Sequence, residues 1–197
     1  TSNNGIYIFD SRTNSLLQHI DSKTIKNIED FGVYNMVFDK SGFLWLGTRG
    51  NGLGCLDTAN NKLSIYTANA KDPSSLGANN ISNVFIDNSN TLWVCCQYGY
   101  LNRFNRDKRT FEKFTPQVDN ARFINANSIS CINQDRDGNY WIGTFGKGLY
   151  ALSATYNNFM TFIPSNTGIS KSAVWPVTAF AELDNGIIAY ACDGGGI

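Results

Sequence analysis

The sequence predicts an all-β fold built from four-stranded antiparallel units, and three observations carry this prediction. A tryptophan-centred motif returns every 48 residues, and self-similarity at a fixed period is typical of repeat architectures. Each period contains four short β-prone runs separated by turn residues, and no run has the pattern of a long amphipathic helix. The motif occupies residues 42–48, 90–96 and 138–144, with a divergent copy at 186–192.

The first complete unit shows how the sequence defines its strands, which we name A to D in chain order. Residues 33–38 are apolar at both alternating sets of positions, which predicts a strand A that is buried on both faces. Residues 39–42 end in Gly42 and predict a turn, because glycine adopts positive φ without steric cost. Strands B, C and D are expected at 43–48, 53–57 and 63–66.

The remaining strands follow from the same register. The chain enters with strands C and D of an incomplete unit, at 6–10 and 16–20. The second unit has strands at 81–87, 91–96, 101–105 and 110–114, and the third at 129–135, 140–144, 149–153 and 159–162. The last unit starts near Val174 and contains only strands A and B. Long connectors join D to the next A at 67–80, 115–128 and 163–173, and connectors of that length tend to be functional or mobile.

A four-stranded antiparallel unit repeated every ~40–50 residues is typical of a β-propeller blade. One blade cannot bury both of its faces, so neighbouring blades stack, and Trp45, Trp93 and Trp141 are expected to fill the gaps between them. The predicted division is a partial blade at 1–22, complete blades at 23–66, 67–114 and 115–162, and a partial blade at 163–197.

Three aspartates, Asp39, Asp87 and Asp135, also recur at the end of strand A. They suggest either a catalytic or calcium-binding carboxylate in each blade, or a side chain that accepts backbone N–H groups of the A–B turn. We favour the second interpretation, because equivalent positions in successive blades lie too far apart to form one cluster.

The composition limits the classes of partner and chemistry. Sixteen basic and sixteen acidic side chains balance, which argues against nucleic acid or an anionic membrane as a partner. No apolar run approaches the roughly 20 residues of a membrane span, so no membrane insertion is expected in this region. The five cysteines have no zinc-binding spacing and are expected to be mostly unpaired, and no metal or cofactor is expected. His19 is the only histidine, and its repeat neighbours supply no carboxylate partner.

The third copy of the repeat carries the resemblance to a known family most fully. It resembles the regulator-propeller repeat of bacterial hybrid two-component sensors, and the segment 72–76 is similar to the connector between blades of that family. The matching residues are Ile129, Ile132, Asp135, Gly138, Trp141, Ile142, Gly143, Thr144, Gly148 and Leu149. The second copy departs from the pattern at Asn90, Cys95, Cys96 and Tyr100, and the fourth at Ala189.

The resemblance implies a periplasmic sensor that binds a nutrient signal, often an oligosaccharide, and passes it to a kinase region outside this chain. Such sensors usually carry propellers of seven blades, so the resemblance implies a fragment of a larger ring whose remaining blades are its partners. The alternative that stays open is a closed four-bladed ring, in which the first and last partial blades complete each other. Formation of a homodimer is also left open.

Three functions stay open at this point: a ligand-binding sensor, a propeller enzyme acting on glycans as a lyase or glycosidase, and a protein-interaction scaffold. Fold alone cannot separate them. Glycoside hydrolysis needs two carboxylates that converge on one bond, and the repeat register brings no such pair together. We therefore assign no catalytic residue and favour the sensor.

The B–C turns are the predicted ligand face, because their residues vary while their frame is fixed. Strand direction alternates, so these turns share one face with the D–A connectors, and the A–B and C–D turns share the other. Aromatic, cationic and amide side chains together suit a sugar ring stacked on an aromatic, with donors for hydroxyls or a carboxylate. The predicted ligand-binding residues are Arg49, Asn51, Gln97, Tyr98, Phe145, Lys147 and Asp193, joined by Tyr34 and Trp175 near the starts of strand A.

Overall fold

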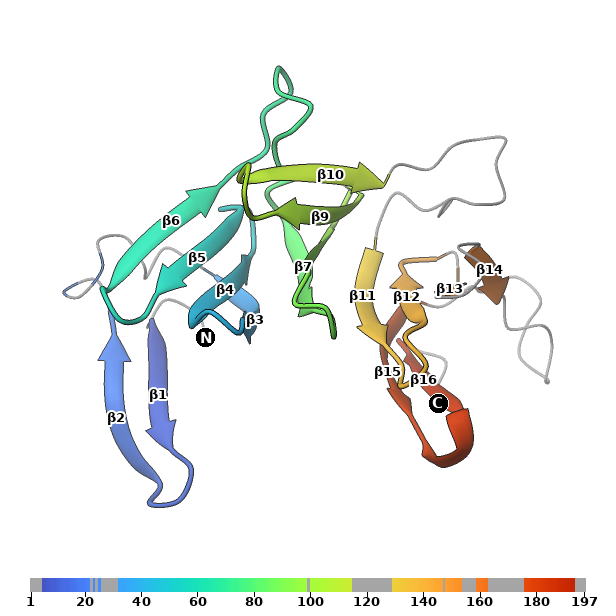
Figure 1. Cartoon of the computed structure of the whole chain (residues 1–197), viewed down its shortest axis with the longest axis horizontal. Helices are drawn as coiled ribbons and strands as arrows, with labels where there is room; N and C mark the ends of the chain where they lie inside the picture. Colours follow the sequence, from blue (N-terminus) through green and yellow to red (C-terminus); the bar gives the residue numbers. More distant parts are fainter. Residues whose placement is uncertain are drawn as a thin grey trace.

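The computed structural model describes residues 5–21, 23, 25, 32–98, 100–114, 129–146, 148–153, 159–162 and 176–193. In this part the chain is all-β, and its sheets follow one another along an open arc (Figure 1). The only helical segment among these residues is a single 3₁₀ turn, η2, at Asp184–Gly186. None of the described residues belongs to a helix with the length and hydrophobicity of a membrane span.

Three sheets have four antiparallel strands in sequential order, as predicted. The first contains β3 (Val33–Phe38), β4 (Phe43–Thr48), β5 (Leu53–Asp57) and β6 (Lys62–Tyr66). The second contains β7 (Ile81–Ile86), β8 (Leu92–Cys96), β9 (Leu101–Asn105) and β10 (Thr110–Phe114). The third contains β11 (Ile129–Gln134), β12 (Tyr140–Thr144), β13 (Leu149–Leu152) and β14 (Phe159–Phe162). We call these sheets blades 1, 2 and 3.

Two hairpins lie at the two ends of the arc (Figure 1). One pairs β1 (Ile6–Asp10) with β2 (Ser15–Ile20), and the other pairs β15 (Val177–Glu182) with β16 (Ile188–Cys192). The two hairpins form separate two-stranded sheets, so the described residues do not close a four-bladed ring. The predicted start of the last unit, Val174, and the connectors at 115–128 and 163–173 lie outside the described residues.

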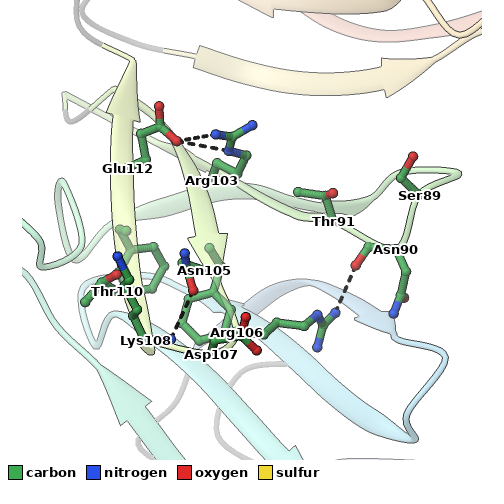
Figure 2. Close-up of a pocket in the computed structure, with 12 residues that line it drawn as sticks. Ser89, Asn90, Thr91, Arg103, Asn105, Arg106, Asp107, Lys108, Thr110 and Glu112 are labelled. Carbon is green, nitrogen blue, oxygen red and sulfur yellow. Dashed lines mark hydrogen bonds and ion pairs between the residues drawn. The ribbon is translucent and has the colours of Figure 1, made fainter.

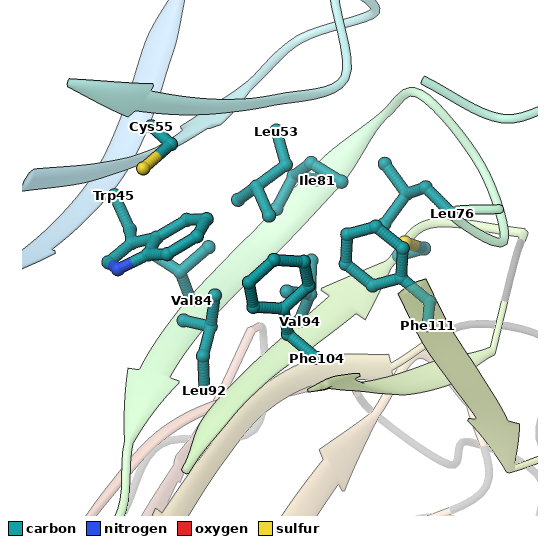
Figure 3. Close-up of a cluster of buried hydrophobic side chains, with 11 residues drawn as sticks. Trp45, Leu53, Cys55, Leu76, Ile81, Val84, Leu92, Val94, Phe104 and Phe111 are labelled. Atoms are coloured by element: carbon teal, nitrogen blue, oxygen red, sulfur yellow. The ribbon is translucent and has the colours of Figure 1, made fainter. Parts of the chain in front are cut away.

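The hydrophobic core lies between neighbouring blades, where the tryptophans were predicted to pack. Trp45 of blade 1 is 2% exposed, and its ring meets Phe104 of blade 2 edge-on with 5.0 Å between centroids. Leu53 packs in the same cluster, beside Ile81 of blade 2 (Figure 3). Trp93 of blade 2 meets Tyr140 of blade 3 in the same way, at 5.3 Å. Burial of such rings supplies a few kcal/mol each, so the blades depend on one another for stability.

The prediction that strand A of the first unit is buried on both faces was wrong. In β3, Tyr34, Met36 and Phe38 are 53–58% exposed, whereas Val84, the equivalent of Met36 in blade 2, is 4% exposed. Val84 is covered by blade 1, whereas Val33, which is only partly buried, is the β3 residue that packs against the cluster of the β1–β2 hairpin. The apolar pattern of strand A therefore recurs in every unit, but its side chains are buried only where a neighbouring blade covers them.

The connector at 67–80 is a packed structural element. Leu76 is 1% exposed and belongs to the core between blades 1 and 2. Two contacts dock the connector on blade 2: Asn102 Oδ1 accepts a hydrogen bond from Gly77 N at 2.9 Å, and Ser74 O accepts one from Phe111 N at 2.7 Å. This connector therefore fastens one blade to the next.

Candidate functional site

Each strand A begins with a bulge at the same repeat position. In β3 the pairing with β4 passes from Val33 to Asn35 while the partner strand advances by one residue, so Tyr34 is the extra residue. The same shift occurs in β7, β11 and β15. Bulges redirect the extra side chain, and they are frequent beside functional sites. The extra residues are Tyr34, Ser82, Ser130 and Thr178.

These four bulge residues line one cavity of about 310 Å³, together with Arg49, Gln97 and Phe145 from the B–C turns, Asn80 at the end of the connector and Ile81 at the start of β7. We call it the bulge cavity. Equivalent positions of four successive sheets therefore converge on one hollow. Because it lies where B–C turns and the starts of strand A meet, the predicted sharing of one face by these segments is confirmed.

The serine hydroxyls of the cavity bridge neighbouring sheets. Ser82 Oγ donates a hydrogen bond to the carbonyl oxygen of Ile129, and Ser130 Oγ donates one to that of Val177. In blade 1 the equivalent residue is Tyr34, and the guanidinium carbon of Arg49 lies 5.8 Å from the centre of its ring. The blade 1 end of the cavity therefore presents an aromatic ring and a cation where the other blades present a small bridging hydroxyl.

Two amide side chains lie between the ends of the cavity. Asn80 Nδ2 donates a hydrogen bond to Gln97 Oε1 at 2.5 Å, and Gln97 N donates one to Asn80 O at 2.9 Å. The side-chain contact orients the two amides toward each other, and the backbone contact holds the two residues side by side. At the far end, the ring of Phe145 is 41% exposed, so it offers an open face to a ligand.

A larger hollow, of about 580 Å³, lies on the opposite face among the A–B and C–D turns of blade 2 (Figure 2). All its lining residues come from this one blade. Two of its three cations already have acidic partners, since Arg103 pairs with Glu112 and Arg106 with Asp39. Size alone favours this hollow as a ligand site. We favour the bulge cavity because several blades build it and its arginine has no acidic partner among the described residues.

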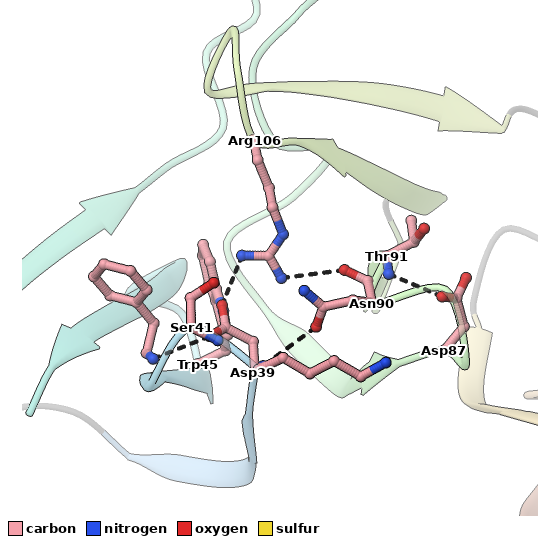
Figure 4. A network of polar contacts seen from close by, with 9 residues as sticks. Asp39, Ser41, Trp45, Asp87, Asn90, Thr91 and Arg106 are labelled. Carbon is pink, nitrogen blue, oxygen red and sulfur yellow. Dashed lines mark hydrogen bonds and ion pairs between the residues drawn. The ribbon is translucent and has the colours of Figure 1, made fainter.

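The recurring aspartates are structural, as favoured from the sequence. Asp39 Oδ1 accepts hydrogen bonds from Ser41 N at 2.9 Å and Phe43 N at 3.0 Å, and Oδ2 accepts one from Trp45 Nε1 at 2.8 Å (Figure 4). Asp87 and Asp135 repeat the arrangement with their own turns and tryptophans. Burial raises the pKa of Asp39, but the hydrogen bonds outweigh it, so the pKa lies below its ordinary 3.8.

Comparison with known proteins identifies the repeat. Residues 124–146 match the sequence profile of the family described as two component regulator propeller. The chain therefore carries a two-component regulator propeller repeat. No curated protein gives a significant match.

Solved structures share the fold. The extracellular domain of hybrid two-component system BT4673 from B. thetaiotaomicron matches 97% of the chain with a TM-score of 0.68 and 21% identity. That of BT3049 from the same organism matches 83%, with a TM-score of 0.67 and 20% identity. PorZ, a type-IX secretion component of Porphyromonas gingivalis, matches 95% with a TM-score of 0.68 and 17% identity, and the chain covers 28% of it. The chain spans 23% and 21% of the two hybrid-system domains.

Four of the predicted ligand-binding residues meet around the bulge cavity, namely Tyr34, Arg49, Gln97 and Phe145. That they bind a ligand stays a prediction. Three others do not line it: Asn51, whose N–H donates to Thr48 Oγ1 at 3.2 Å, and the exposed Tyr98 and Asp193. Lys147 and Trp175 lie outside the described residues. The sequence prediction missed Asn80, Ile81, Ser82, Ser130 and Thr178, although the last three are the repeat equivalents of Tyr34.

Two further expectations concern the cysteines and His19. All five cysteines are free, as expected. The expectation that His19 lacks a carboxylate partner was wrong, because Asp21 Oδ2 lies 3.9 Å from His19 Nδ1. The repeat register missed this contact, since it arises just beyond the end of β2. The ring of His19 also stacks on Tyr7 with 4.1 Å between centroids, which is a packing role.

Proposed function

We propose that this chain is part of the extracytoplasmic, periplasmic sensor propeller of a two-component receptor, and that it binds an oligosaccharide in the bulge cavity. The regulator-propeller repeat and the likeness to extracellular domains of hybrid two-component systems support the sensor role. The remaining blades and the kinase region of such a receptor are the proposed partners.

The observation that carries the proposal is the composition of the bulge cavity. Ligand sites are concave, have volumes of roughly 300–1,000 Å³, and combine aromatic surface with a few fixed polar groups. The bulge cavity has this volume, with two aromatic rings, Tyr34 and Phe145, at its ends and the Asn80–Gln97 amide pair between them. Sugars present an apolar ring face and a rim of hydroxyls, and this arrangement suits both.

The alternative functions differ in what they require of the cavity. Hydrolysis of a glycosidic bond needs converging carboxylates, and the described lining contains no Asp, Glu or His. A protein-interaction scaffold needs a surface and no sugar-sized hollow. The observations therefore favour binding without turnover.

A screen of the purified protein against an oligosaccharide panel tests the proposal. Melting temperature and product analysis by mass spectrometry are read from the same samples. A ligand at ~100 times its Kd stabilises the folded state by about 2.7 kcal/mol, so a rise in melting temperature without product is the expected result. Product formation supports the glycan-degrading enzyme instead, and neither effect supports the scaffold.

A matched set of variants then locates the site. Arg49→Ala is expected to weaken binding, whereas Lys62→Ala, on an exposed position of β6 outside the cavity, is expected to leave it unchanged. Loss of binding in the Lys62 variant with retention in the Arg49 variant would show that the wrong face was chosen.

A further inference from the structure

The bulge cavity has a charge that its proposed sugar-binding role does not require. Arg49 is the one charged side chain among the described residues that line it. Neutral sugars need hydrogen-bond partners but no net charge. The following inference rests on the proposed function and concerns the class of sugar.

Arg49 has no acidic partner within the described part of the chain. Four of the five other described arginines have an acidic partner, and Arg109, which lies outside the cavity, does not. The pairs are Arg12–Asp10, Arg103–Glu112, Arg106–Asp39 and Arg136–Glu182. A guanidinium binds a carboxylate through two parallel hydrogen bonds, so an arginine without an acidic partner in a cavity is suited to an anionic ligand group.

The structure also holds Arg49 in place. Its backbone N–H donates to the carbonyl of Gly32 at 3.0 Å, and its guanidinium lies beside the ring of Tyr34. A guanidinium held against an aromatic ring loses less side-chain freedom when it binds. Tyr34 occupies the position where Ser82 and Ser130 bridge blades, so this end of the cavity differs from the others.

We propose that the bulge cavity selects an acidic oligosaccharide. The carboxylate of a uronic acid residue pairs with the guanidinium of Arg49, and an adjoining sugar ring stacks on Phe145 at the other end. The Asn80–Gln97 amides face the hydroxyls between them. Asp193, the fourth equivalent of Arg49, does not line the cavity and so does not oppose an anion there.

Calorimetry with uronate oligosaccharides and their methyl esters tests this inference, because esterification removes the charge and keeps the ring and linkage. The probes are short oligomers of galacturonate, glucuronate and mannuronate, each with its ester and with the corresponding neutral oligomer. We expect at least one acid to bind and its ester to bind roughly 10- to 100-fold more weakly, as for loss of a charge-assisted hydrogen bond.

The variants assign this charge preference to one side chain. Arg49→Met should remove the preference for acid over ester, and Arg49→Lys, which keeps the charge without the planar fork, should retain part of it. Arg109→Met is the matched control, because Arg109 also lacks an ion pair among the described residues and lies in the β9–β10 turn on the opposite face.

The two levels of the proposal fail in different ways. If neutral oligomers bind as tightly as acids and Arg49→Met changes neither, the acidic preference is wrong while the sugar-binding function stands. If no oligosaccharide of either kind binds, both are wrong. Equal melting temperatures of the variants without ligand show that a lost preference does not come from unfolding.

Discussion

Asp39 and Arg106 form an ion pair across the boundary between blades 1 and 2, with 2.6 Å between Oδ2 and Nη1, although 67 residues separate them in the chain. The aspartate side chain is fully buried, and Arg106 also donates to the carbonyl of Asn90 (Figure 4). Asp87 meets the next blade differently, through the hydroxyl of Tyr140 at 2.7 Å. Each of these carboxylates therefore orders its own turn and fastens the following blade.

Removing the charge of Asp39 should destabilise the fold. Asp39→Asn leaves Arg106 without its carboxylate and gives Trp45 a weaker acceptor. The expected loss in free energy of unfolding is about 1–3 kcal/mol, measured by urea titration. Asp107→Asn, at an exposed position of the β9–β10 turn, is the control and should change stability little. Equal stabilities of the two variants would contradict the role of the ion pair.

Stability should also fall in acid. The pKa values of Asp39, Asp87 and Asp135 are lowered because hydrogen bonds to each carboxylate outweigh the effect of burial. A carboxyl whose pKa is lower in the folded state contributes stability above its ordinary pKa and loses that contribution as pH falls through the folded value. The free energy of unfolding should therefore be constant near neutrality and decline below about pH 5.

Urea titrations at several pH values test this dependence. Asp39→Asn should show a shallower decline than the parent protein, since one of the three carboxylates no longer titrates. An identical decline in both would show that other groups govern acid unfolding.

The connector at 67–80 should be as important to stability as a strand. Leu76→Ala leaves a cavity between blades 1 and 2, and such truncations cost about 2–5 kcal/mol. Lys71→Ala changes an exposed residue of the same connector and is expected to be neutral. Urea unfolding compares them, and a neutral Leu76 variant would mean that the connector is not part of the core.

The strands and their order were predictable because each strand is short, β-prone and repeated in register. Pairings across blades were less predictable where they break the repeat. The positions equivalent to Arg106 hold Thr58 and Ala154, so no periodic signal indicated its contact with Asp39. The indole N–H of Trp45 was also missed as a donor to Asp39, because sequence spacing does not show side-chain direction.

The candidate site was predictable only in part, for a geometric reason. The repeat identified the B–C turns, but the bulge at the start of each strand A decides which side chains reach the cavity. The bulges recur at one position of the repeat, but no residue type in the sequence marks that position as a bulge. Ser82 and Ser130 were therefore overlooked beside the more conspicuous Tyr34.

The cysteines should be nearly unreactive in the folded protein. Burial raises the pKa of Cys55 to about 11 and that of Cys96 to about 12, and the reactive species is the thiolate. With an aromatic disulfide reagent at about pH 8, below the ordinary thiol pKa, we expect a slow reaction led by the half-buried Cys192. All five thiols should react after unfolding without reductant. Cys192→Ser should remove the early phase. Rapid reaction of several thiols in the folded state would contradict the burial.

Two aromatic residues of the B–C turns distinguish the bulge cavity from the exposed turns in general. Phe145 lines the cavity, whereas Tyr98 is 79% exposed with φ of 62° and does not line it. Once a ligand is identified, Phe145→Ala should weaken binding by about 1–3 kcal/mol through loss of ring contact, and Tyr98→Ala should have little effect. Calorimetry on both variants measures the difference. If Tyr98→Ala loses binding and Phe145→Ala keeps it, the ligand lies on the outer rim of the turns, and the bulge residues do not form the site.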